Sequence, residues 1–118
     1  TPLIVAAYNG HADVCRILID LGHANIDFQD NSHKAALTLA AYEGHAEVIK
    51  VLLARGANVN IIDEYGWTAL MLAAFSGHSY VCYLLLENNA NRHVITRNGK
   101  TAVVLAREAN HNDTANLI

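Results

Sequence analysis

Histidine is the residue type in this chain with the clearest capacity for chemistry, because the 118 residues include seven imidazoles. Imidazole nitrogens bind zinc and act as general bases. Four of the histidines recur in the pairs Gly10-His11, Gly44-His45, Gly77-His78 and Asn110-His111. The first members of these pairs are almost evenly spaced, at positions 10, 44, 77 and 110. Such regular spacing indicates one structural position that is repeated along the chain.

A metal site at these histidines is not expected. Zinc holds its ligand nitrogens at about 2.0–2.1 Å, whereas consecutive helical units pack roughly 8–10 Å apart. Neighbouring members of the series therefore cannot share an ion. The other three, His23, His33 and His93, form no His-x-x-x-His or Cys-x-x-Cys spacing with any partner. We predict that the repeated imidazoles hydrogen-bond to backbone in the turns between helices, and we expect no metal or other cofactor.

Nucleophilic catalysis is also not indicated. The two cysteines, Cys15 and Cys82, each lie within an apolar run, where a free thiol is usually a small buried hydrophobe. Two isolated thiols favour a reducing compartment, the cytoplasm or the nucleus. No serine lies in a Gly-x-Ser-x-Gly elbow, and no glycine-rich phosphate loop is present. We therefore expect no enzymatic activity.

The composition excludes several further classes of protein. Hydrophobic residues make up 53% of the chain and charged residues 16%, the opposite of a disordered sequence. The apolar runs are shorter than the roughly 18 residues that a membrane-spanning helix needs, so membrane insertion is not expected. The net charge is −3, and no basic stripe for nucleic acid is visible.

The elements that position these residues follow from the periodicity. Apolar residues at helical spacing lie on both sides of each Gly-His pair, at 3–8, 37–42 and 70–75 before it and at 14–19, 48–53 and 81–86 after it. This pattern predicts two short helices per unit. Helices this short are marginal alone, so they must bury their faces on the next unit. The predicted fold is an all-α stack with one continuous core.

Three features together resemble the ankyrin repeat family. They are the period of 33, the string Thr-Ala-Leu-Met-Leu-Ala-Ala at 68–74 before Gly77-His78, and the string Leu-Leu-Ala-Arg-Gly-Ala-Asn-Val-Asn at 52–60. The resemblance implies an ankyrin-repeat solenoid with hairpin-like connecting loops, forming a single domain over 1–118. Its repeats would span about 1–29, 30–62, 63–95 and 96–118. Because the first unit lacks a preceding turn, we expect the chain to belong to a larger polypeptide.

The chain departs from the family pattern at the start of the first helix of each unit. The usual Thr-Pro-Leu-His lacks its histidine in all four units, and in the second unit Ala35 also replaces the threonine. That helix is therefore expected to lack a side-chain N-cap, which is worth about 1 kcal/mol. In the same unit His33 replaces the turn glycine and is expected to adopt a positive φ.

The resemblance also implies a concave groove, formed by the hairpin tips and the exposed side of each first helix, that binds partners. The corresponding tip positions are Asn31, Ser32, Lys34, Glu64, Tyr65, Trp67, Arg97, Asn98 and Lys100, and the helix-end positions are Tyr8, Asn9, Tyr42, Glu43, Phe75, Ser76, Glu108 and Ala109. We predict partner binding at Tyr8, Tyr42, Glu43, Glu64, Tyr65, Trp67, Phe75, Arg97 and Lys100.

The aromatic side chains are the most distinctive part of this surface. Tyr8, Tyr42 and Phe75 recur at intervals of 34 and 33, which predicts an aromatic ladder along one face. The alternative is that the rings only pack against neighbouring hairpins. Exposed tryptophan and tyrosine are enriched in binding hot spots. The charges nearby are of both signs, which does not indicate a partner of strongly single sign.

We therefore expect a non-catalytic module that binds a protein or peptide through the aromatic ladder, with an apolar anchor near Trp67. One alternative is a structural spacer within a longer ankyrin array. Another is a substrate of an asparaginyl hydroxylase, since the family resembles targets in which a leucine stands eight residues before the modified asparagine. Leu52 and Asn60 have that spacing, but Asn58 stands where such targets carry an acidic residue.

Overall fold

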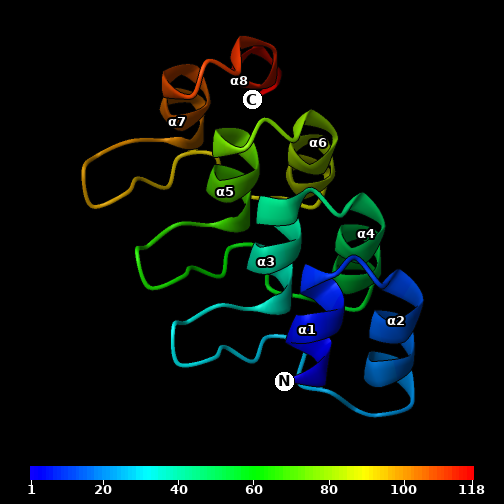
Figure 1. Ribbon diagram of the computed structural model, residues 1–118. Helices are drawn as coiled ribbons and strands as arrows, with labels where there is room; N and C mark the ends of the chain where they lie inside the picture. Colours follow the sequence, from blue (N-terminus) through cyan, green and yellow to red (C-terminus); the bar gives the residue numbers. More distant parts are fainter.

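The computed structural model describes residues 1–118 as eight short helices in four antiparallel pairs. The helices are α1 (Pro2–Tyr8), α2 (Ala12–Asp20), α3 (Ala36–Glu43), α4 (Ala46–Ala54), α5 (Ala69–Phe75), α6 (Ser79–Glu87), α7 (Ala102–Glu108) and α8 (Asn112–Leu117). Figure 1 shows the odd-numbered helices in one row and the even-numbered helices in a second row to its right. The predicted all-α solenoid is confirmed.

Three long connecting segments project from the same side of the stack, next to the row of odd-numbered helices (Figure 1). A carboxylate closes the first two of these hairpins. Asp30 Oδ1 accepts hydrogen bonds from the Ser32 and Lys34 amides, and Asp63 Oδ1 accepts from the Tyr65 and Trp67 amides. In the third hairpin Thr96 Oγ1 takes this place and accepts from the Lys100 amide at 3.1 Å. Each tip is therefore held in a fixed shape.

The first helix of each pair begins at a side-chain cap, with one exception. The hydroxyls of Thr1, Thr68 and Thr101 accept hydrogen bonds from backbone amides three residues later. Ala35 has no such group, which confirms the predicted loss of the N-cap in the second pair. Thr38 partly replaces it, because its hydroxyl accepts from the Ala35 amide and donates to the Ala35 carbonyl, both at 3.0 Å.

Two of the four repeated histidines, His45 and His78, join their helix pair to the pair before it. His45 Nε2 lies 2.9 Å from the Tyr8 carbonyl oxygen, and His78 Nε2 lies 3.0 Å from that of Tyr42. The predicted bond to backbone is confirmed at these two positions, although the acceptor belongs to the preceding pair. His11 has no pair before it and is exposed.

Glycine is required where these rings meet the preceding turn. Gly44 has a φ of +78°, and a methyl group there would lie 2.7 Å from the His78 ring. Only a residue without a side chain fits both the backbone conformation and the space. His33 has a φ of +59°, as predicted, at a hairpin tip where no such ring lies on it.

The core runs between the two rows of helices as one cluster of 26 buried residues. Leu37, Leu52, Leu70 and Leu85 are among its largest fully buried side chains. Both cysteines are free and fully buried, as predicted, and burial raises the pKa of the Cys82 thiol to about 12. No helix in the chain combines the length and hydropathy required to cross a membrane.

Candidate partner-binding groove

The hairpin tips form one wall of an open groove of about 750 Å³, and the row of odd-numbered helices forms the other. Its lining side chains from α3, α5 and α7 are Thr38, Leu39, Tyr42, Leu72, Phe75, Leu105 and Glu108. Those from the hairpins are Lys34, Asp63, Tyr65, Trp67, Thr96, Arg97, Asn98 and Lys100. The groove therefore spans three hairpins and three helices, all held by the stacking described above.

Aromatic rings form the central part of the groove. Trp67 is half-buried and packs edge-on against Phe75, with ring centroids 5.5 Å apart and an interplanar angle of 78°. Phe75 is still 42% exposed and Tyr42 48% exposed, and Tyr65 is also exposed. Phe75 therefore packs against a hairpin residue, as the alternative interpretation of the aromatic ladder expects. The aromatic side chains nevertheless leave a large apolar surface open to solvent.

Six of the nine predicted partner-binding residues line this groove, namely Tyr42, Tyr65, Trp67, Phe75, Arg97 and Lys100. Tyr8, Glu43 and Glu64 do not. Tyr8 is exposed at the end of α1, but no hairpin precedes that helix, so nothing forms the opposite wall. Glu64 contributes through its backbone, since its carbonyl accepts a hydrogen bond from Arg97 Nη2 at 2.8 Å.

The leucines that form the floor of the groove were not identified as site residues from the sequence. Leu39, Leu72 and Leu105 line it at equal intervals of 33, one in each of α3, α5 and α7. The repeat alignment contains this signal, but the sequence alone does not separate a leucine in the core from one that faces the groove. Leu39 and Leu72 are half-buried, which distinguishes them from fully buried neighbours such as Leu70.

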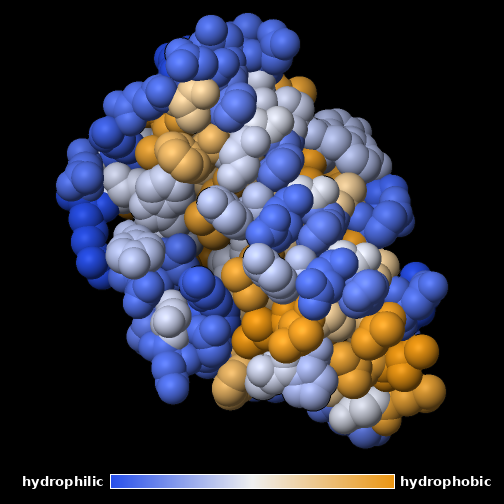
Figure 2. All heavy atoms as spheres, viewed as in Figure 1, coloured by the Kyte–Doolittle hydropathy of each residue, from blue (hydrophilic) through white to orange (hydrophobic).

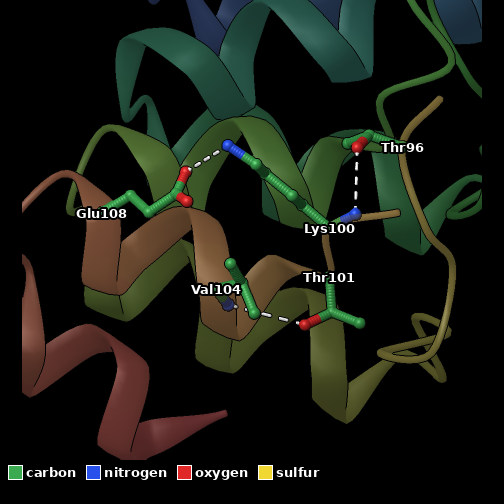
Figure 3. A network of polar contacts seen from close by, with 5 residues as sticks. All are labelled: Thr96, Lys100, Thr101, Val104 and Glu108. Atoms are coloured by element: carbon green, nitrogen blue, oxygen red, sulfur yellow. Dashed lines mark hydrogen bonds and ion pairs between the residues drawn. The ribbon is translucent and has the colours of Figure 1, made fainter. Parts of the chain in front are cut away.

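The charged side chains of the groove differ in whether they are already paired. Lys100 Nζ forms an ion pair with Glu108 at 2.7 Å, while the Lys100 amide bonds to Thr96 (Figure 3). Asp63 accepts hydrogen bonds from its two hairpin amides but has no cationic partner. Lys34 and Arg97 also take part in none of the four ion pairs of the structure. Three cations and two carboxylates line the groove, so its lining carries a net charge of 3 − 2 = +1.

A second aromatic cluster, which the sequence did not single out, lies on the second-row helices. Tyr80 and Tyr83 of α6 stack with centroids 6.3 Å apart, and Lys50 Nζ lies 5.3 Å from the Tyr80 ring. The neighbouring Tyr80, followed by the Glu47 carboxylate, raises the pKa of Lys50. This cluster is exposed but does not line the groove, so it provides a comparison surface for binding experiments.

The remaining candidate positions show no arrangement for chemistry. No three His, Cys, Asp or Glu side chains are placed to hold a metal ion together. Asn60 is exposed, but its Oδ1 accepts a hydrogen bond from the Asn91 amide of the next hairpin at 2.9 Å. An enzyme that modified Asn60 would have to break this bond between units.

Comparison with known proteins agrees with this geometry. A family model described as ankyrin repeats (3 copies) matches residues 1–63 and 55–118, which together cover the whole chain. No curated protein matches the chain.

Proposed function

Because the chain belongs to the ankyrin repeat family, whose members are generally protein–protein interaction modules, we propose that it binds a protein or peptide partner in the groove without catalysing a reaction. The observation that carries this proposal is the exposed apolar surface around Trp67 and Phe75. Contiguous exposed apolar surface rimmed by polar groups is typical of interaction sites.

The shape and composition of the groove support a macromolecular ligand. It is open along three hairpins, so it suits an extended segment better than a small enclosed molecule. Tryptophan and tyrosine are the residue types that most often supply large shares of binding energy. The aromatic pair is held by Asp63 and by α5, so little conformational entropy is lost when a partner binds.

Replacing Trp67 by alanine should weaken binding to the true partner by about 2 kcal/mol or more, roughly 30-fold in the dissociation constant. The partner would be captured on the immobilised wild-type chain and its affinity then measured by titration calorimetry. Tyr83→Ala removes an exposed aromatic ring outside the groove and is the matched control, expected to bind like wild type. Equal affinities of wild type and Trp67→Ala, both folded, would contradict the proposal.

We also propose that the chain is a segment of a longer array, located in a reducing compartment such as the cytoplasm or nucleus. Positions 14, 48, 81 and 114 are equivalent in the four pairs. Val48, Val81 and Thr114 are at most 2% exposed, whereas Val14 is 46% exposed. Figure 2 shows the resulting hydrophobic surface over α1 and α2, at lower right. A further helix pair would cover Val14 and supply the backbone acceptor that His11 lacks.

A further inference from the structure

We infer, on the basis of the proposed function, that the ligand of the groove is an extended peptide with one large apolar side chain on Trp67, an acidic side chain about three residues away toward Lys34, and a second acidic side chain within about three residues on the Arg97 side. Two properties of the groove support this inference: the order of the side chains along it, and whether each charge is already paired.

Equivalent hairpin positions carry a cation, an aromatic ring and a cation in turn. Lys34, Trp67 and Lys100 stand at intervals of 33, at the same place in successive hairpins. Lys100 is neutralised by Glu108. Arg97 lies in the same hairpin without a carboxylate partner, but its guanidinium reaches back to the middle hairpin, where Nη2 donates a hydrogen bond to the Glu64 carbonyl at 2.8 Å. A ligand that crosses the hairpins therefore meets the unpaired Lys34 cation first, and then the aromatic centre with the Arg97 cation close to it.

The acidic side chains of this region do not cancel that pattern. The Asp63 carboxylate is held within its own hairpin by two backbone amides and adds to the negative charge of the middle hairpin, whereas Glu108 is neutralised by Lys100. Glu64 lies outside the groove lining and beside Tyr65, where its charge raises the pKa of the Tyr65 hydroxyl. A negative charge at the middle hairpin disfavours an acidic ligand side chain there and favours a neutral one. The sequence alone shows only that charges of both signs are present. The structure shows which charged side chains form an ion pair within the chain and which do not.

The dimensions set the spacing within the ligand. Packed helices lie about 8–10 Å apart, and we take this as the spacing of consecutive hairpins. An extended chain advances about 3.3 Å per residue. One hairpin interval therefore corresponds to about three residues, which gives the pattern acidic-x-x-apolar on the Lys34 side. On the other side the Arg97 guanidinium reaches back to the Glu64 carbonyl, so the second acidic residue falls within three residues of the apolar one.

The test is a selection from a displayed library of random 12-residue peptides on the wild-type chain, with removal of peptides that also bind Trp67→Ala. We expect the selected peptides to carry a large apolar residue with Asp or Glu three residues away on one side and within three residues on the other. Selected peptides that are neutral or basic at those two positions would overturn this inference and leave the proposed function standing. If no selected peptide depends on Trp67, the proposed function fails as well.

A charge-reversal experiment checks the assignment of the two cations. The double variant Lys34→Glu, Arg97→Glu should bind a selected peptide about tenfold more weakly, because two exposed ion pairs become repulsive. A peptide with lysine at both acidic positions should regain the lost affinity on that variant. Arg16→Glu, Lys50→Glu changes the net charge equally, outside the groove, and should leave affinity unchanged. Equal weakening by both double variants, or no rescue, would overturn the inference.

Discussion

Replacing Gly44 by alanine is expected to lower the free energy of unfolding by about 3 kcal/mol. Two costs contribute to this value. A non-glycine residue at a φ of +78° is strained by about 1–2 kcal/mol, and a methyl group 2.7 Å from the His78 ring adds an overpacking cost of about 1–3 kcal/mol. The ring cannot withdraw freely, because its Nε2 is bonded to the Tyr42 carbonyl at 3.0 Å.

Gly56 provides the matched control for this prediction. It also follows a helix and has a φ of +86°, but a methyl group there would meet nothing within 4 Å. Gly56→Ala should therefore show only the backbone strain, about 1–2 kcal/mol. Urea unfolding of both variants measures the difference, and equal losses would show that the histidine contact is unimportant. In a double-mutant cycle, His78→Ala should relieve part of the Gly44→Ala penalty, since the two residues are in contact.

Replacing Val48 by aspartate is expected to cost on the order of 4 kcal/mol or more, enough to unfold much of the chain. Val48 of α4 is fully buried and belongs to the hydrophobic core cluster. An unpaired charge in an apolar environment is among the most destabilising changes a core can receive.

Val14→Asp makes the same chemical change at the equivalent position of the first pair. Because Val14 is largely exposed here, we expect a change of within about 0.5 kcal/mol. Thermal unfolding of both variants tests the comparison. A loss at Val14 as large as that at Val48 would contradict the open first face. In a longer chain with a further helix pair before α1, Val14→Asp should become as damaging as Val48→Asp.

The helix pairs could be predicted because their signals are local and repeated. The Gly-His pairs fix where each first helix ends, and the apolar spacing on both sides fixes which residues are buried. The missing cap at Ala35 could be predicted for the same reason, since it depends on one residue type. Its partial replacement by Thr38 could not, because that depends on a side-chain rotamer and not on a repeated pattern.

The groove was predictable only in part, because it depends on contacts between units. Equivalence along the chain placed Tyr42 and Phe75 in the groove correctly but also suggested Tyr8, which lacks a preceding hairpin. The free charges of Lys34 and Arg97 could not be deduced from composition. They follow from the pairing of Lys100 with Glu108 and from the use of Asp63 within its own hairpin.

Backbone amide chemical-shift mapping of the isotope-labelled chain, titrated with a peptide selected as above, tests the central claim most directly. That claim is that recognition takes place on the hairpin side of a rigid stack. We predict that the largest shifts fall at residues 33–34, 64–67 and 97–100 and at the ends of α3 and α5. Shifts centred instead on Tyr80 and Tyr83 of the second-row helices, or spread over the whole core, would contradict it.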